Sequence, residues 1–257
     1  MTTDTQKVAL VTGGAKRIGR AIALALAERG WDVVVHYGRS ADDALATVRA
    51  IEARGRRAAA VACDLADEAA VKILLARATA ALDGSRISCV VNNASLFEHD
   101  AAADFSNARL DAHMHTNLAA PILLAHALHA ATPTGSHAVV INLLDQKLFN
   151  LNPDFLSYTL SKAALHSATA MLAQALAPTV RVVGVAPGIT LISGNQTVAG
   201  FVNAHSHTPL GRSSMPDDIA NAVCYLAEAR AVTGTTLVVD GGQHLLPLPR
   251  DVMFVAN

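Results

Sequence analysis

Short runs of Val, Ile, Leu and Ala alternate along the chain with longer segments of helical periodicity. The runs are typical of buried strands and cover residues 7–11, 31–36, 57–63, 87–91, 138–143, 180–185 and 236–240. The segments between them predict helices at 21–27, 40–54, 67–82, 107–130, 155–177 and 216–229. Continuously apolar runs suit parallel strands that are covered on both faces. The pattern predicts an α/β fold with a doubly wound, seven-stranded parallel sheet and helices on both faces.

The alternation continues without a break that would mark a domain boundary. No linker rich in Pro, Gly or Ser divides the 257 residues, so we expect a single domain over 1–257. Residues 189–210 form a loop-rich insert that we expect to cover the substrate. Residues 243–257 form an apolar, proline-bearing tail, which we expect to pack on a neighbouring subunit or near the substrate mouth.

Two uncharged stretches, 116–137 and 163–180, are long enough to suggest membrane spans. Both contain polar residues and an internal proline, and both lie within the alternation of strands and helices, so we interpret them mostly as helices. A surface helix normally keeps a charged face. We therefore expect a homotetramer in which helices 107–130 and 155–177 are covered by the sheet and by partner subunits. The alternative is an Ala-rich helix that is tolerated at the surface.

Composition excludes several classes of protein. The formal net charge of −1 argues against a nucleic-acid partner, which normally requires a basic surface. Three cysteines lie far apart among apolar neighbours, as expected of reduced, buried thiols in a cytoplasmic protein. The polar N-terminus lacks the apolar core of a signal peptide, and we expect no membrane association.

The first strand runs into a glycine-rich turn, Thr12 to Gly19, and then into a helix and a second strand. This βαβ unit has the expected size for a dinucleotide-binding turn of the Rossmann fold. Glycines permit close approach of a phosphate, and the helix N-terminus offers unpaired N–H groups and a positive dipole end. A simple tight turn between strand and helix is the alternative.

Tyr158 and Lys162 stand four residues apart in a predicted helix, so they share one face. A free tyrosine titrates near pH ~10, and an adjacent cation lowers the pKa of a phenol. The pair thus predicts a proton donor with an acidic phenol, provided that a cofactor binds beside it. Gly13, Asp64, Asn92, Asp145 and Pro187 follow predicted strands, which places one site along the carboxyl edge of the sheet.

With these motifs in hand, the chain resembles the short-chain dehydrogenase/reductase family over residues 7–242. The motifs are the glycine turn, Asp64-Leu65, Asn92-Asn93-Ala94, Asn117, Tyr158-x-x-x-Lys162 and Pro187-Gly188. The resemblance implies that Tyr158 donates a proton, that Lys162 lowers its pKa and holds the nicotinamide ribose, and that Asn117 orders a water relay. Asn117 has an alternative role as a helix-kink residue before Pro121. The implied cofactor-binding residues are Gly13, Arg17, Ile18, Gly19, His36, Tyr37, Arg39, Ser40, Asp64, Leu65, Asn92, Ala94, Lys162, Pro187 and Gly188.

Two positions depart from the usual pattern of that family. Arg17 replaces the middle glycine of the turn, and Asp145 replaces the serine thirteen residues before Tyr158. Both substitutions resemble pteridine reductases and bacterial dihydromonapterin reductases. That resemblance makes Asp145 a fourth catalytic residue beside Tyr158, Lys162 and Asn117. The implied substrate-binding residues are Arg17, Ser95, Phe97, Asp145 and Tyr158.

The substitutions are chemically consistent with a pterin. The Arg17 guanidinium suits both a phosphate and a polar heterocycle, and Phe97 offers a flat face for stacking. Asp145 suits a substrate whose ring nitrogens must be protonated, whereas a serine serves a simple carbonyl. Alternatives stay open: Phe97 as ordinary core, Ser95 as a loop cap, and Asp145 as an inert substitution in another reductase.

The residues after the second strand bear on cofactor choice. NAD-specific relatives place an acid there, whereas residues 36–40 contain none, and Arg39 and Ser40 suit a 2′-phosphate. We therefore expect an NADPH-dependent reductase that acts on a dihydropteridine such as dihydromonapterin, dihydrobiopterin or dihydrofolate. The alternatives are a carbonyl reductase, for example of 3-oxoacyl thioesters, and a catalytically silent NADP-binding sensor. The histidines lack metal-ligand spacing with cysteines or carboxylates, so we expect no metal.

Overall fold

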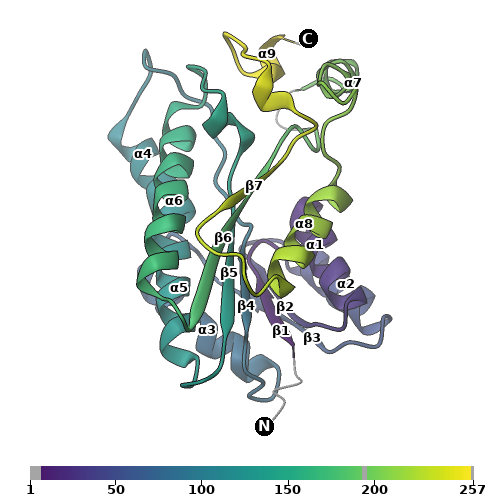
Figure 1. Ribbon diagram of the computed structural model, residues 1–257, viewed down its shortest axis with the longest axis vertical. Coiled ribbons are helices and arrows are strands. Elements are labelled where there is room, and N and C mark those ends of the chain that lie inside the picture. Colours follow the sequence, from purple (N-terminus) through teal and green to yellow (C-terminus); the bar gives the residue numbers. More distant parts are fainter. Residues whose placement is uncertain (1–6, 193–195, 256–257) are drawn as a thin grey trace.

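The strands form one parallel sheet at the centre of the molecule. The structure is a computed structural model that describes residues 7–192 and 196–255. Within these residues the strands are β1 (Val8–Val11), β2 (Asp32–Tyr37), β3 (Ala58–Ala62), β4 (Cys89–Asn92), β5 (Ala138–Leu143), β6 (Val180–Pro187) and β7 (Thr236–Val239). Their order is β3-β2-β1-β4-β5-β6-β7, which confirms the predicted doubly wound sheet (Figure 1). The order reverses between β1 and β4, where ligands bind in such sheets.

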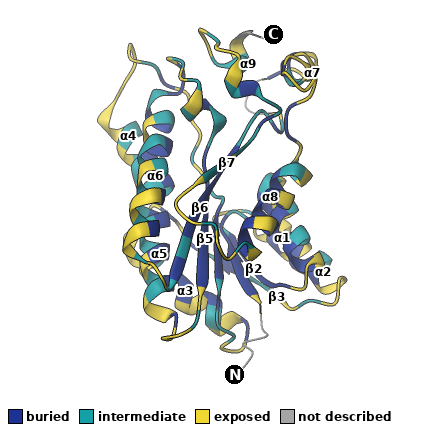
Figure 2. Cartoon of the chain, viewed as in Figure 1, coloured by how far each residue is buried: buried dark blue, intermediate teal, exposed yellow. Residues whose placement is uncertain are grey.

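Helices cover both faces of the sheet. The first face carries α1 (Arg17–Glu28), α2 (Ala41–Glu52) and α8 (Pro216–Glu228), and the second carries α3 (Glu68–Ala81), α5 (Ala120–Ala131) and α6 (Leu156–Ala175). Side chains alternate across a strand, so Ala9 and Val11 join the first apolar core while Val8 and Leu10 join the second. Figure 2 shows the central strands as deeply buried, whereas β3 and β7 at the two edges of the sheet are more exposed.

The helix predicted at 107–130 is interrupted. It consists of α4 (Asn107–Met114), a π-helical turn η1 (His115–Ala119) and α5. Pro121 lacks the N–H group that an α-helix would supply to the carbonyl of Asn117. Single π turns inside α-helices are frequent at functional sites. The π turn therefore contains Asn117, which the sequence analysis identified as a candidate catalytic residue.

The insert expected to be loop-rich contains a helix, α7 (Val198–Ser206). The Thr197 hydroxyl caps it by accepting a hydrogen bond from the N–H of Gly200 (3.0 Å). Two valines and a glycine in nine residues weaken helix propensity, which hid this helix from the sequence pattern. Three short elements complete the chain: the 3₁₀ turns η2 (Gln146–Phe149) and η3 (Gln243–Leu245), and α9 (Val252–Val255).

Several global features concern the described residues alone. No helix among them is long and apolar enough to cross a membrane. Cys63, Cys89 and Cys224 lie buried as free thiols. In the same residues, no cluster of three or more His, Cys, Asp and Glu side chains is arranged to hold a metal ion.

Candidate active site

The turn after β1 forms a narrow backbone cradle. Gly13 has φ +62°, and a Cβ atom on Gly19 would collide with the Gly13 carbonyl oxygen. The N-cap of α1, Lys16, makes no side-chain capping bond, and no acidic residue lies in the first turn. N–H groups and a positive dipole end therefore remain for an anion. These features fit the pyrophosphate of a dinucleotide.

Polar side chains fix this turn from behind. The Thr12 hydroxyl accepts hydrogen bonds from the N–H groups of Asn93 and Ala94 (both 3.0 Å), and the Asn93 amide donates to the Thr12 carbonyl (2.9 Å). Thus the turn after β1 and the end of β4 form one unit. Sequence reasoning quoted Thr12 and Asn93 as parts of motifs but assigned neither a role.

The His36 ring supports the glycine turn. His36 was expected to contact the cofactor, and in the structure its ring is buried behind the turn. Its Nδ1 accepts from the Gly13 N–H (3.1 Å), and its Nε2 lies 3.0 Å from the Cys63 carbonyl, to which it donates. Burial lowers the pKa of His36, which favours this neutral tautomer. The ring therefore positions Gly13.

The ends of β2, β3 and β4 differ in exposure. Arg39 is exposed, and Ser40 precedes α2 without a side-chain capping bond. Asp64 is exposed as well, whereas Leu65 is buried. Asn92 was expected to contact the cofactor, but it is buried and its amide donates to Asn142 of β5 (2.8 Å). Its observed contact joins two central strands.

The predicted acid–base residues meet at the end of β5. The Tyr158 hydroxyl donates to Asp145 Oδ2 (2.7 Å), and the Lys162 ammonium donates to the Leu143 carbonyl (2.7 Å). The Lys162 Nζ atom lies 5.8 Å from the centre of the Tyr158 ring. Tyr158 and Lys162 are buried and share one face of α6, as their spacing predicted.

The direction of the Tyr158 pKa corrects one expectation. The sequence predicted that Lys162 lowers this pKa, but burial and the Asp145 charge raise the pKa of Tyr158 well above its ordinary value. Burial also raises the pKa of Asp145 and lowers the pKa of Lys162 to about 8. A buried phenol beside a carboxylate stays protonated, so the pair stores a proton in a hydrogen bond.

Asn117 lies in the π turn and joins three elements. Its amide donates to the Leu96 carbonyl (2.9 Å) and to the Ser161 hydroxyl of α6 (3.0 Å), and its oxygen accepts from the Leu96 N–H (2.8 Å). Ser161 is buried and donates in turn to the Tyr158 carbonyl (2.6 Å). The Asn117 side chain thereby fixes the segment after β4 against the helix that carries Tyr158.

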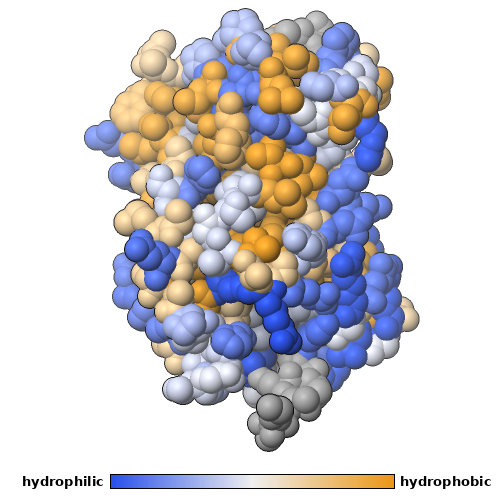
Figure 3. Space-filling view, viewed as in Figure 1, coloured by the Kyte–Doolittle hydropathy of each residue, from blue (hydrophilic) through white to orange (hydrophobic). Residues whose placement is uncertain are grey.

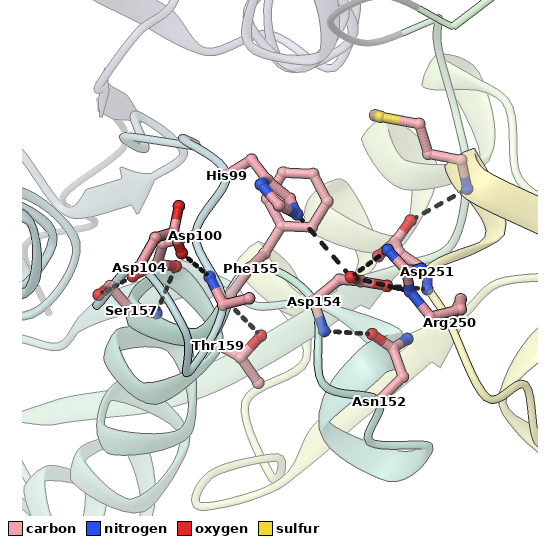
Figure 4. Close-up of polar contacts among 12 residues, drawn as sticks. His99, Asp100, Asp104, Asn152, Asp154, Phe155, Ser157, Thr159, Arg250 and Asp251 are labelled. Atoms are coloured by element: carbon pink, nitrogen blue, oxygen red, sulfur yellow. Dashed lines mark hydrogen bonds and ion pairs between the residues drawn. The ribbon is translucent and has the colours of Figure 1, made fainter.

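The N-terminus of α6 is held by a residue that the sequence did not indicate. Asp100 is fully buried and accepts from the N–H of Ser157 (2.9 Å) and from its hydroxyl (Figure 4). Phe155, the N-cap, has φ +55° and makes no capping bond of its own. Asp100 lies 57 residues before Ser157, so no local pattern reveals this cap.

A pocket opens beside this group, and all five predicted substrate residues line it. They are Arg17, Ser95, Phe97, Asp145 and Tyr158. Phe97 is 40% exposed, stacks on Phe155 (centroids 4.3 Å apart) and meets the Tyr158 ring edge-on (4.7 Å). Arg17 has φ +53°, a conformation that explains why glycine is usual at this position.

Segments far along the chain complete the pocket wall. Pro187 and Gly188 line it together with Ile189, Thr190, Leu191 and Gln196 of the insert. Lys147 lines it as well, and so do Asp251, Val252 and Met253 of the tail. Sequence reasoning missed Lys147 as a site residue because no local motif marks it.

Comparisons with known proteins agree with this geometry. A family model described as "Enoyl-(Acyl carrier protein) reductase" matches residues 13–244. An uncharacterized oxidoreductase of Methylorubrum extorquens is 36% identical over 247 residues, which cover 92% of this chain and 97% of that protein. The 3-oxoacyl-[acyl-carrier-protein] reductase FabG of Staphylococcus aureus is 32% identical over 247 residues, with coverages of 93% and 98%.

One solved structure combines high overlap with a named activity. FolM alternative dihydrofolate reductase 1 from Brucella canis, complexed with NADP, superposes with a TM-score of 0.90. It is 40% identical, and the match covers 95% of this chain and 96% of that one.

Proposed function

The chain belongs to the short-chain dehydrogenase/reductase family and is an NADP-dependent oxidoreductase, and we propose that it reduces a dihydropteridine. Dihydromonapterin, dihydrobiopterin and dihydrofolate share the ring that this pocket would hold. NADPH would supply the hydride when bound. The residues of the chain hold the ring and supply the proton that accompanies reduction.

The observation that carries the proposal is the hydrogen bond between Tyr158 and Asp145 (2.7 Å). A carbonyl requires one hydrogen bond to its oxygen, whereas a pterin requires protonation of a ring nitrogen. A buried carboxyl of raised pKa beside a protonated phenol provides both an acceptor for N–H groups and a proton source. The FolM structure, whose title names a dihydrofolate reductase, supports the same substrate class.

Three residues would orient the substrate. Arg17 reaches the pocket from the start of α1, so its guanidinium can meet the cofactor phosphate and the heterocycle. Phe97 presents its ring beside Tyr158, where it can stack on a flat substrate. Ser95 lies at the rim and can accept or donate a hydrogen bond.

The preference for NADPH follows from the end of β2. The loop after Tyr37 carries Arg39 and no carboxylate, and the Ser40 hydroxyl makes no capping bond to α2. A cation and a free hydroxyl at a helix N-terminus suit a 2′-phosphate.

A direct assay tests the proposal. Purified protein and NADPH are mixed with dihydropterins, dihydrofolate or 3-oxoacyl thioesters, and NADPH absorbance is followed while the products are identified by chromatography. We expect tetrahydropterin products and turnover of dihydropteridines at the highest kcat/KM. Turnover of ketones alone would move the assignment to a carbonyl reductase.

That second candidate has its own support. The S. aureus relative is a 3-oxoacyl-[acyl-carrier-protein] reductase, and the matching family model carries an acyl-carrier-protein description. Asp145, however, places a carboxylate with two oxygens in the site, whereas a single hydroxyl would suffice to bind the oxygen of a carbonyl substrate. The silent sensor is disfavoured because the Tyr158–Lys162 pair is in place for chemistry.

We also propose a homotetramer formed through residues 107–130 and 155–177. On α6, Leu160 is 45% exposed and Met171 is 69% exposed, and the only charged residue of that helix, Lys162, is buried. Such a face gains from a second subunit. Light scattering after size exclusion should show a tetramer for the native chain and a smaller species for Met171→Glu. The buried free thiols suit a cytoplasmic location.

A further inference from the structure

The last described residues return to the body of the protein and close one side of the substrate pocket. After η3 the chain runs outward and then back, so that Arg250 and Asp251 face the segment before α6 (Figure 4). Hydrophobic side chains gather over the upper half of the face in Figure 3, the half where Figure 1 places α7 and α9.

A multiple hydrogen bond fastens this segment. The Arg250 guanidinium donates to both carboxylate oxygens of Asp154 (Nη2–Oδ1 2.8 Å, Nε–Oδ2 2.8 Å), and the Asp251 N–H donates to Asp154 Oδ2 (2.7 Å). The Asp154 side chain is only 4% exposed. The Arg250 hydrogen bond holds the pKa of Asp154 below its usual range. Forked Arg–carboxylate pairs of this kind are stronger and more specific in geometry than ordinary surface pairs.

Aromatic rings continue the attachment as far as the reacting group. Phe254 packs parallel to Phe155 (centroids 6.0 Å apart), with the Arg250 guanidinium 5.0 Å from its ring centre. Phe155 stacks on Phe97, and Phe97 meets Tyr158 edge-on. A displacement of the tail therefore changes the support of the ring expected to stack on the substrate.

A buried lysine forms a second connection. Lys147 is 3% exposed; its ammonium donates to the Asp154 carbonyl (2.5 Å) and lies 3.3 Å from Asp251 Oδ2. Its backbone N–H donates to Asp145 Oδ1 (2.9 Å). The tail is thus connected to the catalytic carboxylate through one residue.

We propose that the Arg250–Asp154 pair is a clamp that holds residues 250–254 as the specificity-determining wall of the substrate pocket. Arg250 and Asp154 act as positioning residues, and Asp251, Val252 and Met253 form the wall, since all three line the pocket that contains Tyr158. The clamp selects a flat, polar ring over a flexible chain because the wall faces Phe97 and Asp145. This preference rests on the proposed dihydropteridine function, whereas the clamp itself does not.

The charges around Tyr158 and Asp145 make the pH profile of kcat/KM a useful measurement, because a purely structural role of the tail would not change it. Asp145 is faced by Tyr158, Lys147 and Asp251, and Tyr158 is faced also by Lys162 and by the His113 ring (6.5 Å). After burial, the Asp251 charge is among the causes that raise the pKa of both Asp145 and Tyr158. Loss of the wall should therefore shift the pH profile of kcat/KM to lower pH.

The test compares Arg250→Met, which keeps the stem but loses the fork, with Arg230→Met at an exposed arginine outside the pocket lining. Phe254→Ala is a second arm that leaves the ion pair intact. We expect Arg250→Met to raise the KM for the dihydropteridine by about 10- to 100-fold, the scale of a misplaced positioning contact, with an unchanged Kd for NADPH. Hydrogen exchange of residues 250–254 should accelerate, and Arg230→Met should match the native enzyme.

The outcomes separate the two proposals. If the hydrogen-exchange rate of residues 250–254 is native in both Arg250→Met and Phe254→Ala, the clamp is contradicted. If exchange is faster but the KM and the pH profile stay native, the role of these residues as a specificity-determining wall is contradicted. A native enzyme that reduces no dihydropteridine contradicts the proposed function instead. The clamp is then judged by tail exchange and by the KM of the substrate that the enzyme does reduce.

Discussion

The two halves of the cleft are built in different ways. The expected cofactor half is built mainly on a local backbone cradle, formed by the glycine turn and the N-terminus of α1, together with side chains such as Arg39 at the end of β2. The substrate half is made of side chains from positions as distant as Arg17, Phe97, Asp145, Tyr158 and Asp251. The first is largely local in sequence, whereas the second depends on the whole fold, and we expect it to determine substrate specificity. A substitution in the substrate half should therefore leave cofactor binding unchanged, and a substitution in the cofactor half should leave substrate preference unchanged.

Tyr158→Phe should give the largest separation between the halves. Removal of the hydroxyl eliminates proton donation, so we expect kcat to fall by about 10²- to 10⁴-fold. Fluorescence titration should show unchanged NADPH binding, because the cradle after β1 is untouched. Tyr225→Phe, at an exposed tyrosine of α8, is the matched control. Equal loss of cofactor affinity would contradict the separation.

Arg39→Asp addresses the cofactor half in the same manner. A charge-assisted hydrogen bond contributes about 1.5–3 kcal/mol, so the preference for NADPH over NADH should fall by about 10- to 100-fold. The relative kcat/KM values for different substrates should not change. Arg49→Asp, on the exposed face of α2, should behave as the native enzyme. Comparable native efficiency with both cofactors would overturn the 2′-phosphate assignment.

Arg17 is expected to contact both cofactor and substrate. Its positive φ lets its effect on stability be measured separately from its effect on binding. A non-glycine residue at φ +53° costs about 1–2 kcal/mol, so Arg17→Gly should raise Tm by about 2–8 °C while it weakens substrate binding. Arg20→Gly, within α1, should instead lower Tm because glycine destabilises a helix interior. Scanning calorimetry distinguishes the two. A lower Tm for Arg17→Gly would show that the guanidinium contacts outweigh the strain.

The smallest effect is a pH dependence of stability at Asp145. Burial raises the pKa of this carboxyl in the folded state, so its stabilising contribution is complete below its unfolded pKa of about 3.9 and is lost as pH rises through the higher folded pKa. Asp145→Asn cannot ionise. Its Tm relative to the native chain should therefore be higher at pH 7.5 than at pH 4.5, as melting curves at both values will show. A constant difference would contradict the raised pKa.

The contrast between the halves also explains what sequence could predict. The strand runs, the glycine turn and the Tyr158–Lys162 spacing are local patterns, and the structure reproduces them with small changes at the element ends. The predicted direction of the Tyr158 pKa was wrong because burial and the Asp145 charge raise this pKa. The contact between the His36 ring and Gly13 could not be predicted, because a position on a strand does not reveal the direction of the ring.

Local sequence patterns could not predict contacts between residues that lie far apart in the chain. Asp100 caps α6 from another loop, and Asp154 binds Arg250 across 96 residues. Helix α7 escaped because it is short and rich in poor helix formers. Each case depends on tertiary structure, which no local spacing encodes.

We propose that Asp145 adapts a common reductase site to a dihydropteridine, and Asp145→Ser is the decisive variant. The measurement is the ratio of kcat/KM for a dihydropteridine to kcat/KM for a 3-oxoacyl thioester, with NADPH, in the native and variant enzymes. We expect a native ratio well above one and a fall of about 100-fold in the variant, because the serine removes a buried hydrogen-bonding partner of the substrate. A native ratio below one, or a ratio that the serine leaves unchanged, would contradict this proposal.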